Sequence, residues 1–264
     1  MEKYDIFIEA GQSNAVGYGH GPVQSPYIPD SRVLYLSDTN PTPEKQLPEN
    51  TYIIEVAQER PYEDGDPNNR IGDLALSFSS RYIQSGLLEE GRKILIIRCA
   101  VGGTGFMYNQ WEMNAPLYLR MLDMIDYALS LNPENRLMGL LWHQGEHDAY
   151  EGNHPGRYRR QLITLVESIK QRYSCPNLPF ICGGFCSEWV VQYQENCTQI
   201  LNVIRDVAAS LNGVFIETDD LLSNNQKNQD GDVVHFCRES LQILGNTYFE
   251  AYQTIINNTL GGLS

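Results

Sequence analysis

The sequence predicts an α/β protein whose parallel β-sheet is covered by helices on both faces. Short, continuous apolar runs recur along the chain, and most end in turns of glycine or polar residues. Between these runs, apolar residues repeat at spacings of three and four, which is the period of an amphipathic helix. Strands that alternate with helices in this way form parallel sheets, because each helix carries the chain back across the sheet.

Five apolar runs are the predicted strands. Continuous apolar runs bounded by turn residues suit strands that are buried on both faces of a sheet. They span residues 6–10, 93–98, 137–142, 179–184 and 213–217. The predicted sheet therefore has five parallel strands, joined by right-handed crossovers.

Five segments with helical periodicity fill the intervals between and after these strands. Each repeats apolar residues along one face, as a helix packed on a sheet requires. They span residues 74–83, 117–131, 158–173, 197–211 and 241–256.

The stretch from about residue 19 to residue 69 interrupts the alternation. It is rich in Pro, Asn, Asp and Tyr. Long loops inside a compact domain usually have a function. Since single α/β domains often exceed about 200 residues, we interpret all 264 residues as one domain with an irregular insertion beside the active site.

The charge of the chain restricts its partners. The formal net charge is -14, which argues against nucleic acid and anionic membranes and suits a neutral or cationic substrate. No apolar run approaches the roughly 18 residues that span a bilayer, and the N-terminus has no signal-peptide pattern. The sequence predicts a soluble, cytoplasmic protein with no cofactor or metal. Its six cysteines form no Cys-x-x-Cys pair and are predicted to be reduced thiols.

Ser13 is a candidate nucleophile. It follows the first predicted strand, in the Gly-Gln-Ser-Asn sequence of residues 11–14. A serine at a strand-to-helix turn holds its hydroxyl near a helix N-terminus, where free amides stabilise negative charge. A serine in this place is also a common helix N-cap, so this turn alone leaves both interpretations open.

Asp232 and His235 are a candidate acid–base pair near the end of the chain. A spacing of three places two side chains on one side of a helical turn. A carboxylate so placed holds one imidazole nitrogen and leaves the other free to act as a base. The alternative is a surface Asp beside a half-buried His.

Two further strand ends carry candidate oxyanion donors. Residues 102–104 read Gly-Gly-Thr after the second strand, and Gln144 ends the third. Glycine lets a backbone amide approach a reacting oxygen closely, and a glutamine amide can donate a second hydrogen bond. Each feature also has a plain structural interpretation, as a tight turn and a polar loop residue.

The four features together resemble the SGNH hydrolase superfamily, and more narrowly carbohydrate esterase family 6 and the sialate O-acetylesterase domain. Those proteins share a Gly-Gln-Ser-Asn turn, a Gly-Gly-Thr loop, a Trp-x-Gln-Gly-Glu segment and an Asp-x-x-His end. In this chain the motifs occupy residues 11–14, 102–104, 142–146 and 232–235, in the same order. The resemblance therefore covers nearly the whole chain.

This resemblance implies a flavodoxin-like three-layer α/β/α sandwich. It implies Ser13 as nucleophile, His235 as base and Asp232 as the residue that orients it. The implied oxyanion hole consists of the Ser13 and Gly103 amides and the Gln144 side chain. The implied reaction is removal of O-acetyl groups from a carbohydrate through an acyl-enzyme, with acetylxylan, related oligosaccharides or sialate as substrates.

The same motifs contribute supporting residues. Gln12, Asn14 and Thr104 are expected to bind substrate or support the site, and Glu146 is expected to brace neighbouring loops. Many relatives follow the Gln-Gly-Glu segment with Ser or Thr, where this chain has His147. That departure leaves the role of His147 open.

Two other functions compete with the esterase. His143, Glu146 and His147 match the His-x-x-Glu-His pattern of one zinc protease class. That pattern needs a helix, whereas here it follows an apolar run and contains a glycine, which disfavours a helix. The other alternative is a non-catalytic carbohydrate-binding protein on a hydrolase fold.

Sugar binding would use aromatic side chains in either case. Of the three tryptophans, Trp142 is expected to pack at a strand end, while Trp111 follows the glycine loop. Trp111 is therefore the better candidate for stacking on a sugar ring, ahead of Trp142 and Trp189.

Overall fold

The computed structural model describes residues 2–38, 52–63, 65–66 and 68–261. Its main feature is a seven-stranded sheet in the order β3-β2-β6-β1-β7-β8-β9. All neighbouring strands are parallel except β2 and β3. The sheet strands are β1 (Lys3–Gly11), β2 (Val33–Asp38), β3 (Tyr52–Val56), β6 (Arg92–Arg98), β7 (Arg136–His143), β8 (Phe180–Gly183) and β9 (Val214–Ile216).

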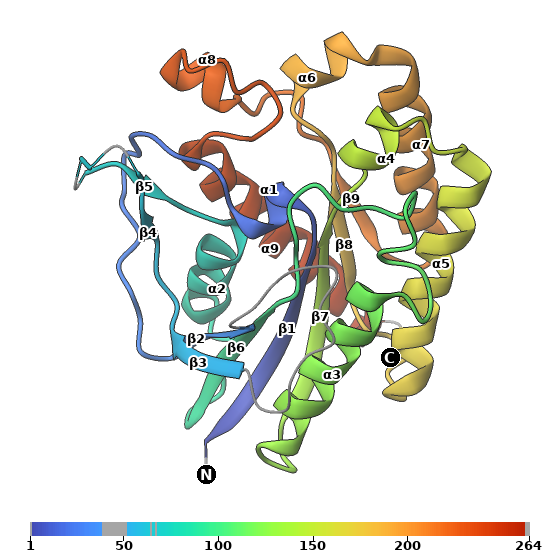
Figure 1. The fold of residues 1–264 in the computed structure, drawn as a ribbon. Helices are drawn as coiled ribbons and strands as arrows, with labels where there is room; N and C mark the ends of the chain where they lie inside the picture. The colour runs from blue at the N-terminus through green and yellow to red at the C-terminus, as the bar shows by residue number, and fades with distance from the viewer. Residues whose placement is uncertain (1, 39–51, 64, 67, 262–264) are drawn as a thin grey trace.

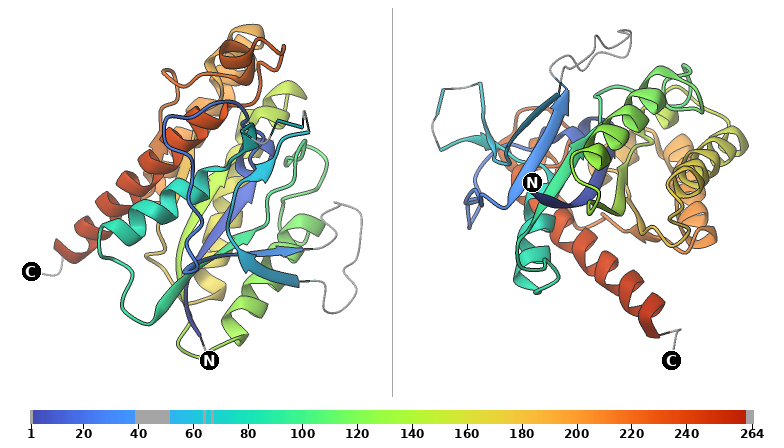
Figure 2. Two further views of the ribbon diagram at one scale, coloured as in Figure 1. Left: turned by 90° about the vertical axis from the view of Figure 1, so that its left-hand side faces the viewer. Right: turned by 90° about the horizontal axis from the view of Figure 1, so that it is seen from below.

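Helices cover both faces of this sheet. Figures 1 and 2 show α2 and α9 on one face and α3, α5 and α7 on the other. The helices are α1 (Ser13–Val16), α2 (Leu74–Gln84), α3 (Pro116–Ser130), α4 (Glu146–Tyr150), α5 (Pro155–Arg172), α6 (Ser187–Gln192), α7 (Gln194–Ser210), α8 (Asn224–Asn228) and α9 (Arg238–Gly261). The predicted α/β class with three layers is confirmed.

The five predicted long helices correspond to α2, α3, α5, α7 and α9, with ends that differ by a few residues. Local chemistry explains three of the starts. Pro116 and Pro155 occupy the first turns of α3 and α5, where the missing N–H costs nothing. The Asp73 side chain caps α2 by accepting a hydrogen bond from the Leu76 amide.

The strand count was predicted incorrectly, because two further strands extend the sheet. β2 and β3 both come from the region interpreted as an irregular insertion. The Val-Leu-Tyr-Leu run of residues 33–36 is buried and pairs with β6, and β3 joins β2 as an antiparallel edge strand. A second, two-stranded sheet pairs β4 (Arg60–Pro61) with β5 (Arg70–Ile71). The Pro- and Asn-rich segments on either side made the apolar run of β2 hard to recognise in the sequence. Residues 39–51 of the predicted insertion lie outside the residues that the structure describes.

All six cysteines are free thiols, and five of them are buried. Burial raises the pKa of the Cys99 thiol to about 12, which keeps it protonated and unreactive. None of the helices in the described part of the chain has the length and hydrophobicity of a membrane-spanning segment.

Candidate active site

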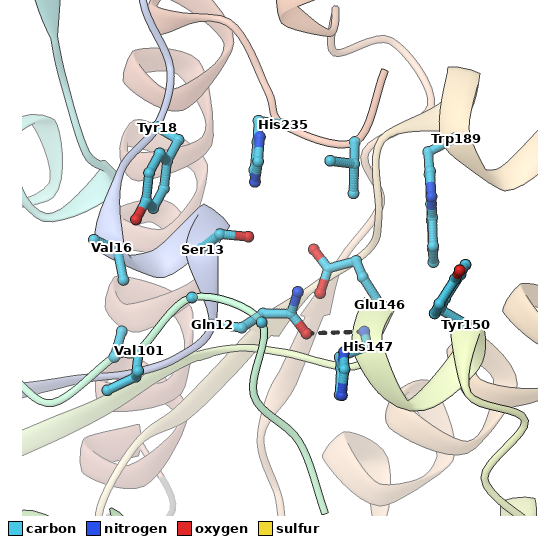
Figure 3. A pocket seen from close by; sticks show the side chains of 14 residues that line it. Gln12, Ser13, Val16, Tyr18, Val101, Glu146, His147, Tyr150, Trp189 and His235 are labelled. Carbon is cyan, nitrogen blue, oxygen red and sulfur yellow. Dashed lines mark hydrogen bonds between the residues drawn. The ribbon is translucent and has the colours of Figure 1, made fainter. Parts of the chain in front are cut away.

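A cavity of about 670 Å³ opens at the carboxyl ends of β1, β6 and β7. This is the edge of a parallel sheet where ligands normally bind. Figure 3 shows that its wall includes Gln12, Ser13, Glu146 and His235. The structure therefore brings together residues that are more than 220 positions apart in the sequence.

Ser13 begins α1 one residue after β1, and the close approach of the end of β1 to the end of β7 determines its place. Gly11 has φ +134°, and a Cβ there would lie 2.0 Å from the His143 carbonyl oxygen. The Gln12 amide donates to the same carbonyl at 2.9 Å. Because only glycine fits this close approach, Gly11 allows the serine turn to sit against the end of β7.

Two arginine side chains hold the other end of α1. Arg98 Nη2 donates to the Val16 carbonyl at 2.6 Å, and Arg60 Nη2 donates to the Gly17 carbonyl at 2.7 Å. Carbonyl groups at a helix C-terminus lack partners within the helix, so cations there stabilise it. These contacts make a four-residue helix a rigid support for Ser13.

Asp232 and His235 form the predicted pair, but in a loop between α8 and α9 rather than on a helix. His235 Nδ1 lies 2.8 Å from Asp232 Oδ2. Asp232 Oδ1 also accepts from the amides of Val234 and His235, and Asn224 Nδ2 donates to Oδ2. The turn that these bonds close, not a helical turn, brings residues three apart together.

The environment of Asp232 keeps it ionised. Burial by itself raises the pKa of this carboxyl, but hydrogen bonds from His235 and Asn224 outweigh it and lower the pKa to about 2. An ionised acceptor at Nδ1 places the ring proton on that nitrogen and leaves Nε2 as the base.

Ser13 and His235 line the same cavity. In Figure 3 the ring of His235 lies above Ser13, and its free nitrogen points toward the serine hydroxyl. No hydrogen bond joins the two side chains in the part of the chain that the structure describes. Catalytic hydrogen bonds are commonly long without substrate and shorten in the complex. Tyr18 stacks on the His235 ring, with 5.1 Å between ring centroids.

The predicted amide donors also reach the cavity. Gly103, with φ +67°, lies on the wall together with Gly102. Among the described residues, neither the Ser13 amide nor the Gly103 amide donates to another protein group. Both are therefore available to a ligand oxygen.

Gln144 does not occupy the place expected of the third donor. Its side chain is buried beside the cavity rather than on its wall. Its Nε2 donates to Asp148 Oδ2 at 2.7 Å and to the Thr104 carbonyl at 3.2 Å, and Tyr158 donates to its Oε1. With both amide hydrogens used, this arrangement does not support the predicted role.

Gln12 occupies the wall instead. Its Oε1 accepts hydrogen bonds from the backbone amides of His147 at 3.1 Å and Gly145 at 3.4 Å. These donors fix the orientation of the amide group, so its Nε2 faces the other way, into the cavity (Figure 3). The oxygen and nitrogen of an amide are assigned from such a network.

Two other predicted supporting residues connect the loops around the cavity. Asn14 Nδ2 donates to Glu146 Oε1 at 2.8 Å and to the Val234 carbonyl, and its Oδ1 accepts from the Phe236 amide. Asn14 thereby ties the serine turn to the histidine loop. Glu146 was expected to brace loop amides, but the partner of its carboxylate is the Asn14 side chain. Burial raises the pKa of the Glu146 carboxyl.

Trp111 was predicted incorrectly as a sugar platform. It is fully buried and packs edge-on against Trp142, with ring centroids 5.3 Å apart. Its Nε1 donates a hydrogen bond to Thr104 Oγ1, which belongs to the Gly-Gly-Thr loop. Trp111 and Thr104 therefore support this loop from the protein interior. The aromatic side chains on the cavity wall are Trp189, Tyr150 and Tyr18. The double glycine of residues 183–184 at the end of β8, five residues before Trp189, is the signal in the sequence that could have pointed to it.

The zinc-protease pattern is not assembled. His143 ends β7 with its Nδ1 on the Tyr248 hydroxyl, and burial lowers its pKa to about 4. His147 lies on α4 and lines the cavity instead. The described residues contain no group of three or more His, Cys, Asp or Glu side chains that could hold a metal ion.

Comparisons with known proteins identify the family of this chain. The family model described as "Carbohydrate esterase, sialic acid-specific acetylesterase" matches residues 3–254. A probable 9-O-acetyl-N-acetylneuraminic acid deacetylase of Escherichia coli (strain K12) is 25% identical over 225 residues, which cover 73% of this chain and 69% of the relative.

Solved structures share the fold. The crystal structure of NanS has a TM-score of 0.75 at 18% identity, covering 97% of this chain and 98% of that one. A carbohydrate acetylesterase from Xanthomonas citri has a TM-score of 0.63 at 15% identity, covering 95% of this chain and 56% of that one. At these identities the likeness is one of fold.

Proposed function

Because this chain belongs to the sialic acid-specific acetylesterase family of carbohydrate esterases, and is therefore a carboxylic ester hydrolase, we propose that it removes O-acetyl groups from carbohydrates by a serine mechanism. The observation that carries the proposal is the meeting of Ser13 with the Asp232–His235 pair in one cavity. Family membership also favours the enzyme over the non-catalytic sugar-binding alternative.

The proposed reaction has two steps. His235 Nε2 accepts the Ser13 proton while Oγ attacks the acetyl carbonyl, and the sugar alkoxide leaves with that proton. Water then attacks the acetyl-enzyme in the reverse sense and releases acetate. Asp232 keeps the ring in the required tautomer and stabilises the imidazolium that forms in each step.

The proposed oxyanion hole has two backbone donors and one side-chain donor. The amides of Ser13 and Gly103 are unpartnered among the described residues and lie on the cavity wall. We assign the third donor to Gln12 Nε2 in place of Gln144, because the amide orientation of Gln12 is already set by the bonds to its oxygen. Preorganised donors of this kind stabilise the developing charge by about 3 kcal/mol each.

The proposed substrates are acetylated xylo-oligosaccharides or related oligosaccharides, and O-acetylated sialate. The Escherichia coli relative is named for the 9-O-acetyl sialate reaction, which supports including sialate. The test is acetate release from a panel of these compounds. Release from at least one sugar ester is expected; release from none, with a correctly folded protein, would contradict the proposal.

Gln12→Ala should lower kcat about 100-fold or more, the usual cost of removing one oxyanion donor. Gln144→Ala tests the alternative assignment in the same assay. If Gln12 is the donor, its loss lowers kcat with little change in KM for a small acetate ester. A normal kcat in Gln12→Ala together with a large fall in Gln144→Ala would return the role to Gln144.

Tyr150→Ala should raise KM for an acetylated oligosaccharide about threefold to tenfold, because stacked aromatic contacts contribute roughly 0.5–1.5 kcal/mol. KM for 4-nitrophenyl acetate, which has no sugar, should not change. Tyr108→Ala is the matched control: both tyrosines are 55% exposed, but only Tyr150 lines the cavity. Equal changes for both esters would exclude Tyr150 as a sugar contact.

A further inference from the structure

A carboxylate on α6 contacts the segment that leads to the proposed base. Glu188 Oε1 accepts a hydrogen bond from Asn225 Nδ2 at 2.7 Å, and its Oε2 accepts one from the Ser223 hydroxyl. Hydrogen bonds to a carboxylate are shorter and stronger than those between neutral groups. Figure 1 shows α6 and α8 beyond the carboxyl ends of the strands. Glu188 therefore joins α6 to the start of α8, a helix of five residues.

The start of α8 in turn holds the loop of Asp232 and His235. The backbone amides of Asn224 and Asn225 donate to the carbonyls of His235 and Asp232 respectively, both at 2.9 Å. Asn224 Nδ2 donates to Asp232 Oδ2 at 2.9 Å, and Asn225 Oδ1 accepts from the Gly231 amide at 3.0 Å. These hydrogen bonds fix both the backbone of the pair and the carboxylate that orients the imidazole.

The opposite end of this connection is anchored in the core. α6 follows β8, and Trp189, the residue next to Glu188, is buried and packs against the rings of Phe185 and Tyr193. The Phe185 carbonyl accepts a hydrogen bond from Thr218 Oγ1 at 2.7 Å, which ties the end of β8 to the segment after β9. Glu188 thus reaches the catalytic loop from a support that is separate from that loop.

The position of His235 relative to Ser13 decides whether the proposed proton transfer can occur. Both residues line the cavity, but no hydrogen bond joins their side chains in the part of the chain that the structure describes. A base must come within hydrogen-bond reach of the proton that it accepts. Because a misplacement of about 1 Å can lower a rate about 100-fold, the contacts that hold this loop affect the reaction directly.

We propose that Glu188 is a positioning residue of this esterase, which holds the acid–base pair over Ser13 through the start of α8. The inference rests on the proposed serine mechanism and deepens it. Since Glu188 does not line the cavity, it acts on the reaction through the loop and does not touch the substrate.

Glu188→Ala should lower kcat about 10-fold to 100-fold. Because the pair acts on every ester, the fall should be similar for the best sugar ester and for 4-nitrophenyl acetate, with little change in either KM. Glu188→Gln keeps one acceptor oxygen and should lose less. Glu112→Ala is the matched control: Glu112 is also partly buried and also bonds two side chains, but these are Arg157 and Gln161 on α5. Its kcat should stay within about twofold of the wild type.

A double-mutant cycle distinguishes positioning from a general structural role. If Glu188 acts through the pair, its removal should change kcat little in the Asp232→Asn background, where the pair no longer functions. A general structural role would lower kcat by the same factor in both backgrounds. The unfolding midpoint of each variant is measured in parallel, and the cycle is run with Glu188→Gln if Glu188→Ala does not fold.

Three results would overturn the inference. One is a wild-type kcat in Glu188→Ala, and another is an equal loss in the two backgrounds of the cycle. The third is a rise in KM for the sugar ester alone, which would mean that Glu188 supports the aromatic wall at Trp189 instead. If the wild type releases acetate from no sugar ester, or if Ser13→Ala is fully active, the proposed function itself fails, and this inference fails with it.

Discussion

Ser13→Ala should lower kcat/KM for acetate release by about four to six orders of magnitude, as removal of the nucleophile does in serine hydrolases. Without Oγ no acetyl-enzyme forms, and only binding and the oxyanion donors remain. The measurement is acetate release from the best sugar ester, with the wild type and the variant at equal concentration. A single-turnover experiment should also show the loss of any initial burst that reports the acyl-enzyme.

The fold should tolerate this change, because Ser13 Oγ makes no hydrogen bond in the described structure. The unfolding midpoint of Ser13→Ala is therefore expected to match that of the wild type. Ser187→Ala is the matched control: Ser187 also begins a short helix after a sheet strand, but it does not line the cavity. Its activity should stay within about twofold of the wild type, since it touches no reacting group. Retention of activity by Ser13→Ala would rule out the serine mechanism.

Asp232→Asn should lower kcat by about three to four orders of magnitude. The neutral amide no longer requires a proton on His235 Nδ1, so the ring can hold its proton on Nε2 instead and cannot accept one from Ser13. Asp230→Asn is the matched control, because Asp230 also pairs with a histidine: its Oδ2 lies 2.6 Å from His20 Nε2. This variant tests whether the loss of any Asp–His pair in this region lowers activity. Since neither Asp230 nor His20 lines the cavity, that variant should keep most of its activity. Equal losses in both variants would point to a general disturbance of the loop.

The pKa of Asp232 also predicts how stability depends on pH. The folded-state pKa is about 2, below the unfolded value of about 3.9. A group whose pKa is lowered by folding stabilises the folded state above its unfolded pKa. This contribution is lost as the pH falls from about 4 to about 2. Asp232→Asn lacks it, so the difference in unfolding free energy between wild type and variant should shrink across this window in denaturant titrations.

The sequence by itself determined the class of fold, the long helices and the order of the catalytic motifs. These features are local. An apolar run bounded by turns, or a repeat of period 3.6, depends on residues that are neighbours in the chain. The proposed catalytic residues followed from the family resemblance that this order of motifs carries. Through that resemblance, Ser13 and His235 were predicted to share one site before their contacts were known.

Other features depended on contacts between distant residues, and only the tertiary structure decided them. Gln12 and Gln144 are both glutamines at strand ends, and only the hydrogen-bond partners of each amide distinguish them. The Gln12 oxygen accepts from the His147 amide, whereas the Gln144 nitrogen donates to Asp148. Trp111 and Trp189 both follow glycine-rich turns, but packing against Trp142 buries the first. Likewise β2 becomes a strand because β6 offers it an open edge. The burial of a side chain and its hydrogen-bond partners depend on residues that are distant in the sequence and close in the fold. Local sequence patterns do not contain this information.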